Sequence, residues 1–397
     1  MRQILLIAAL AFIGIVLAAD RTVDVQINPD CDACNKTDST GTYNNLVYVK
    51  LTGANDLIHI LYSNIDSFTI LLFKTDLDSK LIVNADNLLS KNVTLMLNSI
   101  SFSKAPLDSC GYSFPIIYEF NDENGTANMN DYNNRTDKDH WFLHKTSDFL
   151  WKQFTMVDNS SGQFEGIEPN TNGSFKFLVK FPGKDIRDKT LPHLLLTPEA
   201  TTIDFVLDSL NARFNSTKFG IGAVFLTDMS KNNVSKSSEK TLDDEYTPGT
   251  FTLWSVMSKN SSASVSSYFQ WKPIFYFYDP KSLENSTLTM QYELKSGQSV
   301  PLGIGSAFYS NNTSFMGMNI SFGLQGDHKD GYYYDQTSYS SWTFLVGLGN
   351  APVEKMSPVV TLVIFIGFGL PGLVIVLGIL FMVVKKIRGN RSEFQRL

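Results

Sequence analysis

The sequence predicts a mainly β protein, with lumenal β-sandwich-type domains followed by a single C-terminal transmembrane helix. Short apolar runs rich in Val, Ile, Phe, Tyr and Thr recur along residues 20–357, and Asn, Gly, Asp or Ser separates them. Long stretches with a 3.6-residue apolar period are scarce in the same region. By contrast, the segment from Val359 to Val384 carries no charge and is long enough to cross a bilayer.

The first element is a signal peptide over residues 1–19. A basic residue near the start is followed by an apolar run from Ile4 to Leu17, and two alanines precede the charged Asp20. This order is typical of a secretory signal that is cleaved after small residues. We therefore expect the chain from residue 20 onward to enter the secretory lumen.

The lumenal strands are predicted from the apolar runs themselves. Two short segments, residues 85–90 and 207–211, are predicted as helical turns, and residues 145–154 fit a helix or a strand equally. The predicted strands are Leu46–Leu51, Leu57–Tyr62, Phe68–Phe73, Val93–Leu97, Phe114–Phe120, Phe175–Phe181, Ile203–Leu207, Phe219–Phe225, Ile274–Tyr278, Leu288–Leu294 and Phe315–Phe322.

A charged, proline-flanked stretch over residues 182–192 interrupts this apolar pattern. It predicts two lumenal domains of ordinary size, residues 20–185 and 186–357. A single merged β-unit is the alternative that the pattern leaves open.

Three cysteines stand in the chain, Cys31, Cys34 and Cys110. We expect a structural disulfide from Cys110 to one of the other two, while the Cys-x-x-Cys spacing of the first pair also admits a redox motif. So few cysteines leave the fold to be held by an aromatic-rich core, since the chain has 29 Phe, 16 Tyr and 5 Trp.

Asn-x-Ser/Thr triplets are spread over nearly the whole lumenal part. Such a triplet is an acceptor for N-linked sugar when the chain enters the secretory lumen. Thirteen of them predict a surface covered in glycan. Their asparagines are Asn35, Asn92, Asn124, Asn134, Asn159, Asn172, Asn215, Asn233, Asn260, Asn285, Asn311, Asn312 and Asn319.

The transmembrane helix is predicted over residues 358–384, with a short cytosolic tail over 385–397. Pro371 interrupts the middle of the apolar run, and small residues beside it suit close helix contact. Lys385 and Lys386 follow the run directly, and positive residues remain on the cytoplasmic side. The predicted topology is therefore type I, single-pass, with a lumenal N-terminus.

The tail ends in Phe394-Gln395-Arg396-Leu397. An aromatic residue three positions before a bulky apolar one resembles a lysosomal sorting signal, in which both side chains enter pockets of a sorting adaptor. Phe394 and Leu397 are accordingly predicted to bind such an adaptor.

Charge and motif content argue against several classes of function. Acidic residues outnumber basic ones by 39 to 33, and the tail holds five of the basic ones, so no nucleic-acid partner is expected. His140 and His144 lack the glutamate of a zinc-binding helix, and an ordinary polar surface is expected for them. The acidic run Asp243–Glu245 is expected to be solvated or salt-bridged rather than catalytic. We therefore predict no catalytic residue, metal or cofactor.

Three blocks resemble one known family. Asp243-Asp244-Glu245-Tyr246 is similar to its acidic block, Gln270-Trp271-Lys272-Pro273 to its second block, and Asp335-Gln336 with Trp342 to its membrane-proximal block. Together they identify the chain as a member of the glycosylated lysosomal membrane protein family. The residues of these blocks are expected to be core and turn determinants, with a partner-facing surface as the alternative.

The resemblance implies a non-catalytic protein of the lysosomal membrane. It also implies a role as the accessory subunit of a lysosomal transporter of the major facilitator superfamily that exports dipeptides, protecting it from proteases. Two alternatives remain at this point: a membrane-anchored lysosomal hydrolase, and a cell-surface adhesion or receptor module. A homo-oligomer is compatible with all of them.

Overall fold

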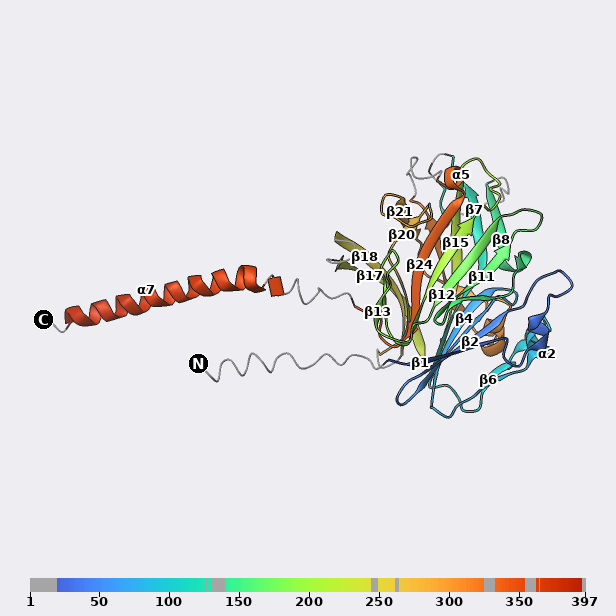
Figure 1. Ribbon diagram of the computed structural model, residues 1–397, viewed down its shortest axis with the longest axis horizontal. Helices are drawn as coiled ribbons and strands as arrows, with labels where there is room; N and C mark the ends of the chain where they lie inside the picture. Colours follow the sequence, from blue (N-terminus) through green and yellow to red (C-terminus); the bar gives the residue numbers. More distant parts are fainter. Residues whose placement is uncertain are drawn as a thin grey trace. The chain divides into compact units, whose positions relative to one another are not determined.

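The computed structural model consists mostly of strands (Figure 1). This confirms the mainly β prediction. The structure describes residues 20–123, 125, 127–129, 140–243, 249–260, 264–310, 312–324, 333–353, 362–363 and 365–394.

One antiparallel sheet, called sheet I here, takes strands from early and late parts of the chain. Its strands pair in the order β1, β2, β3, β4, β7, β16 and β23, with the bounds given next. The members are β1 (Thr22–Ile27), β2 (Leu46–Thr52), β3 (Leu57–Ser63), β4 (Phe68–Thr75), β7 (Asp108–Asn121), β8 (Trp141–Lys145), β16 (Thr217–Leu226), β22 (Lys295–Gln298) and β23 (Phe315–Phe322).

The second sheet, sheet II, is also antiparallel. Its members are β9 (Leu150–Trp151), β10 (Thr155–Asp158), β11 (Ser161–Ile167), β12 (Ser174–Lys180), β15 (Ala200–Asp208), β18 (Gly249–Asn260), β19 (Val265–Trp271), β20 (Ile274–Tyr276) and β24 (Tyr339–Leu348). Figure 1 shows β24 beside β15, and β12 lies on the other side of β15. A further strand, β21 (Ser286–Gln291), pairs with β20 and with β23, so it joins the two sheets at one edge. The structure also has β17 (Asn232–Asp243).

The main core lies between the inner faces of these sheets. Alternate residues along each strand point into it, as period-2 geometry requires; on β3 they are Ile58, Ile60 and Tyr62, all fully buried. Phe68 of sheet I stacks on Phe177 of sheet II with 3.7 Å between ring centroids. Burial of such aromatic surface is the dominant stabilising term of the fold.

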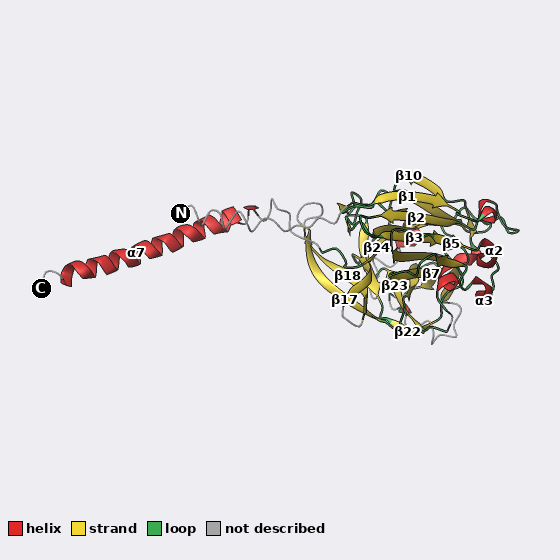
Figure 2. Cartoon of the chain, turned by 90° about the horizontal axis from the view of Figure 1, so that it is seen from below, coloured by secondary structure: helices red, strands yellow, loops and turns green. Residues whose placement is uncertain are grey.

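A second apolar layer covers part of the outer face of sheet I. Alternate side chains of the same strands, such as Leu61, Leu71 and Phe73, pack there against short elements. Figure 2 shows the backbone of several of these elements. These elements are β5 (Leu81–Val83), α2 (Ala85–Leu88), α3 (Val93–Met96), β6 (Ile100–Phe102) and α4 (Ile304–Phe308). The hairpin of β13 (Ile186–Arg187) and β14 (Leu195–Leu196) covers part of sheet II. Shorter pieces are η1 (Asp32–Asn35), η3 (Thr146–Asp148) and α5 (Tyr333–Thr337).

Two local predictions are wrong. The predicted strand Val93–Leu97 is helix α3, because the Asn92 side chain accepts hydrogen bonds from the backbone of Thr94 and Leu95 and so caps a helix. The predicted helical turn 207–211 is the end of β15 followed by a bend at residue 209. The other predicted turn, residues 85–90, contains α2.

The boundary predicted between residues 185 and 186 lies inside one compact unit, formed by residues 20–239 and 252–352. Strands on opposite sides of the boundary pair directly, since β12 pairs with β15 and β7 pairs with β16. The merged β-unit that the sequence left open is therefore the arrangement in the structure.

The favoured disulfide pairing is also wrong. Cys31 and Cys34 form the bridge, with their Cα atoms 5.4 Å apart, and Cys110 is a buried free thiol. Cys110 stands on β7 opposite Leu72 of β4, with its side chain in the main core. Burial raises the pKa of this thiol to about 12. A neutral, apolar-packed thiol of this kind is chemically inert.

The C-terminal helix belongs to a unit separate from the β-rich one. It begins with a π-helical turn over Phe365–Gly369 and continues as α7 over Leu370–Phe394. Residues 365–386 are long and apolar enough to cross a membrane. Pro371 has no backbone N–H for the carbonyl one turn earlier, which accounts for the irregular turn beside it. Helix α7 runs past the predicted end at residue 384, through Lys385 and Lys386.

Candidate functional surface

The acceptor asparagines lie at the surface. Among the ten that the structure describes, none is buried: Asn35, Asn92, Asn159, Asn172, Asn215, Asn233 and Asn312 are exposed, and Asn260, Asn285 and Asn319 are partly exposed. Asn124, Asn134 and Asn311 lie outside the described residues. A sugar chain on any of the ten has a path to solvent.

Asparagines outside such triplets behave differently. Asn28, Asn45 and Asn64 are buried and belong to no acceptor triplet. Their amides bind the backbone: Asn28 donates to the carbonyl of Cys34, and its oxygen accepts from the N–H of Leu46 at 2.8 Å. Among the residues that the structure describes, every buried asparagine is thus one that is not an acceptor.

Turn chemistry places many acceptors at the surface. Asn159 lies between β10 and β11, and Asn172 lies between β11 and β12. Asn and Ser are favoured in such turns because their side chains bind local backbone groups. The same residue types that make the turn therefore present the acceptor.

Most residues of the second and third sequence blocks are buried rather than surface-forming. Trp271 and Trp342 are fully buried and pack edge to face, with 6.4 Å between ring centroids. Gln270 is buried and donates to the Ser255 hydroxyl at 3.3 Å. Pro273 is partly exposed. The core-determinant interpretation therefore fits the two tryptophans and the glutamine.

The remaining block residues differ. Asp335 and Gln336 are exposed on α5, and partial desolvation raises the pKa of Asp335 to about 6. Asp243 is the last residue of β17, but its side chain lies outside the described part of the chain. Asp244, Glu245 and Tyr246 lie outside it entirely. Phe394 is the last residue of α7, and Leu397 lies outside the described residues.

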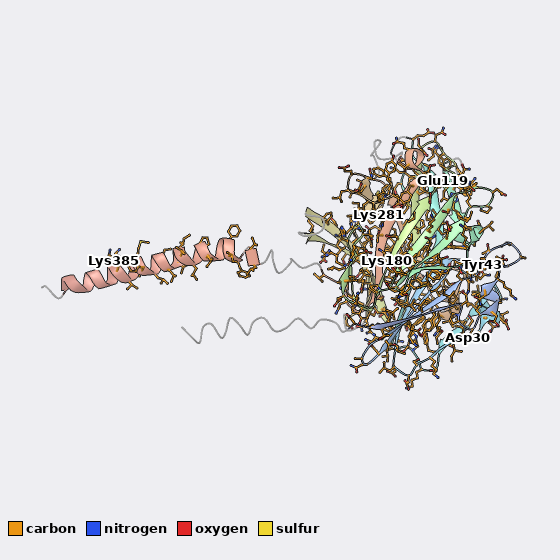
Figure 3. The ribbon with its side chains drawn as sticks, viewed as in Figure 1. Asp30, Tyr43, Glu119, Lys180, Lys281 and Lys385 are labelled. Atoms are coloured by element: carbon orange, nitrogen blue, oxygen red, sulfur yellow. A yellow bond between two sulfur atoms is a disulfide. The ribbon has the colours of Figure 1, made fainter. Side chains whose placement is uncertain are left out.

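The two predicted surface histidines lie at strand β8 rather than on a helix. His144 is buried, which corrects the prediction of a polar surface, and its Nε2 lies 2.7 Å from Oε2 of Glu119. Figure 3 labels Glu119. Glu119 is fully buried and also accepts hydrogen bonds from the Arg213 N–H and the Thr217 hydroxyl. The period-2 pattern of β7 places Glu119 inward, which the sequence reading missed.

Sheet II carries a charged groove of about 650 Å³ on its outer face. Four of its ionic side chains form two pairs: Lys281 contacts Asp204 at 2.8 Å, and Lys176 contacts Asp208 at 2.9 Å. No lining residue is an acceptor asparagine. Within the part of the chain that the structure describes, no group of three or more His, Cys, Asp or Glu residues is placed to hold a metal ion.

A buried histidine makes the fold sensitive to acid. His59 lies on the outer face of sheet I, where its ring contacts the hydroxyls of Tyr48 at 2.7 Å and Thr75 at 2.8 Å. Burial lowers the pKa of His59 to about 4. In the unfolded chain the His59 ring takes up a proton near pH 6.5, but in the folded protein only near pH 4. The free energy of unfolding therefore falls as pH drops from about 6.5 to about 4.

We expect wild type to lose about 2–3 kcal/mol of unfolding free energy at this site between pH 7 and 4.5. His59→Gln removes the titration and should flatten the pH dependence by that amount. Urea unfolding followed by tryptophan fluorescence at both pH values measures it. His193→Gln, on a partly exposed loop, is the matched control. Equal pH dependence of wild type and His59→Gln would contradict the expectation.

Comparison with known proteins gives consistent matches over most of the chain. The family model described as "Glycosylated lysosomal membrane protein" matches residues 45–389. A protein of that name from Danio rerio is 28 % identical over 406 aligned residues, covering 98 % of this chain and 95 % of that protein. "Glycosylated lysosomal membrane protein A" of Xenopus laevis is 28 % identical, covering 91 % and 89 %. The Homo sapiens protein is 26 % identical, covering 90 % and 87 %.

Proposed function

The chain belongs to the glycosylated lysosomal membrane protein family, and on that premise we propose that it is a non-catalytic accessory subunit of a lysosomal transporter of the major facilitator superfamily. The sugar-coated β-rich unit shields the transporter's lumenal loops from lysosomal proteases and so stabilises it. The transporter exports dipeptides. The protein is a single-pass type I protein of the lysosomal membrane.

The observation that carries this proposal is the separation between acceptor and non-acceptor asparagines. All ten described acceptors reach the surface, while the buried asparagines in the described part of the chain are non-acceptors. A shield must hold its sugars outward, and proteases attack loops that open locally. A rigid, aromatic-packed sandwich with sugars on many turns resists that attack and covers a neighbour.

The membrane helix supports attachment to another membrane protein. Its small residues Gly367, Gly369 and Gly372 have open space around the Cβ position, which permits close approach of a second helix. Lys385 and Lys386 at its end support the type I orientation. Phe394 and Leu397 are proposed to bind the sorting adaptor that delivers the protein to lysosomes.

The proposal predicts that loss of this chain shortens the lifetime of its transporter. The full-length protein is purified in mild detergent, and the co-purifying transporter of the major facilitator superfamily is identified. Its half-life is then followed in cells with and without this chain. We expect a several-fold shorter half-life without it, restored by protease inhibitors. An unchanged half-life, or no co-purifying transporter, would rule the proposal out.

Returning variants of this chain to cells that lack it separates the effect of the sugars from the effect of the polypeptide itself. The triple variant Asn159→Gln, Asn172→Gln, Asn215→Gln removes three exposed acceptors and should restore the half-life only in part. Asn55→Gln, Asn211→Gln, Asn350→Gln changes three exposed asparagines that are not acceptors and should rescue fully. Equal rescue by both triple variants would contradict a role for the sugars.

A further inference from the structure

One acceptor has a setting unlike the others. Asn319 stands in the interior of strand β23, which pairs with β16 on one side and with β21 and β22 on the other. The next two residues of its triplet, Ile320 and Ser321, are buried. The enzyme that transfers the sugar binds the acceptor triplet in an accessible stretch of chain. Sugar is therefore added to Asn319 before β23 pairs with its neighbours. The folded sheet must then accommodate it.

The outer face of sheet I provides the space. Asn319 lies opposite Gly222 of β16, which lies opposite Ile116 of β7, so the three positions form a row on one face. A hollow of about 170 Å³ opens beside Asn319. Gly222 keeps it open, because a Cβ there would stand 3.0 Å from the Tyr118 ring and 3.2 Å from Oδ1 of Asn319. Any other residue would fill the space next to the amide.

The hollow has the chemistry that a sugar ring requires. Tyr118, Tyr292 and Met129 give it an aromatic and apolar side, against which the C–H face of a pyranose packs. Glu293, Lys295 and Gln298 supply charged and amide groups for sugar hydroxyl and N-acetyl groups.

We propose that the first N-acetylglucosamine of the glycan on Asn319 lies in this hollow against Tyr118, as a built-in part of the fold. This rests on the proposed lumenal delivery of the chain. Transfer from a lipid-linked oligosaccharide diphosphate joins the Asn319 amide nitrogen to the anomeric carbon. The C–O bond to the diphosphate breaks, the diphosphate leaves with the electron pair, and the amide loses one proton.

The test compares sugar release from folded and unfolded protein. Full-length protein from a secretory host is treated with an amidase that removes N-linked sugars, and each site is followed by glycopeptide mass spectrometry. We expect release at Asn319 to be at least tenfold slower than at the exposed Asn172 in the folded protein, and equal after denaturation. Tyr118→Ala should bring the Asn319 rate close to the Asn172 rate. Tyr278→Ala, at an exposed tyrosine elsewhere, should leave it unchanged.

The wild-type comparison needs no variant, so misfolding of Tyr118→Ala does not block the test. Equal native release at Asn319 and Asn172 would overturn the inference, and so would an empty Asn319 beside an occupied Asn172. Either result leaves the proposed shield intact. Absence of sugar from every site would instead defeat the proposed function itself.

Discussion

Replacing Trp342 by alanine should lower the free energy of unfolding by about 3–5 kcal/mol. Trp342 is fully buried at the middle of β24, and four aromatic rings surround it, the nearest being Phe344 with 4.9 Å between centroids. The others are Phe269, Phe322 and Trp271. Truncation removes both the apolar transfer energy and these ring contacts, and leaves a cavity that a paired sheet cannot close.

Gln336→Ala is the matched control, because Gln336 belongs to the same sequence block but is exposed. It should change stability by less than about 0.5 kcal/mol. Thermal or urea unfolding measures both variants. If Trp342→Ala were as stable as wild type yet lost its transporter, the block would be a contact surface and the core interpretation would be wrong.

The second large effect is expected at Glu119. Glu119→Ala removes the acceptor of three buried contacts, from His144, Arg213 and Thr217. Leaving buried donors without their acceptor, or one side of a buried pair without the other, typically costs roughly 3–5 kcal/mol in total. We expect a loss of that size, measured by urea unfolding.

Two variants test the cause. Glu119→Gln keeps one acceptor oxygen and should lose less than the alanine variant. Glu293→Ala removes a carboxylate whose side chain is 81 % exposed and should cost less than about 0.5 kcal/mol. A loss at Glu119→Ala no larger than at Glu293→Ala would mean that the buried contacts contribute nothing.

Much of the fold is readable from local pattern. Phe315–Phe322 is predicted and found as a strand with the same bounds, and Leu57–Tyr62 and Phe68–Phe73 each match a strand to within two residues. These segments combine β-branched and aromatic residues with clear turn signals, so local preference and burial agree. The uncharged C-terminal run likewise specifies a helix by length and composition alone.

The sequence predictions fail where the residue that decides the structure lies far along the chain, or where the local residue pattern fits both a helix and a strand. Val93–Leu97 has a strand composition, but the capping asparagine before it decides for helix. The pairing of Cys31 with Cys34 depends on where β7 places Cys110, which no spacing reveals. Glu119 and His144 are 25 positions apart and meet only because β7 and β8 pair. The hollow beside Asn319 likewise exists only once three strands align.

Strand β24 is the last strand of the β-rich unit along the chain, yet it pairs with β15 on one side and with β19 and β20 on the other. On the proposed orientation, synthesis feeds the polypeptide through the translocation channel from its N-terminus. The two parts of sheet II on either side of β24 can therefore join only after residues 339–348 have entered the lumen. Every acceptor from Asn35 to Asn319 precedes β24 in the chain, so each one enters the lumen before sheet II is complete.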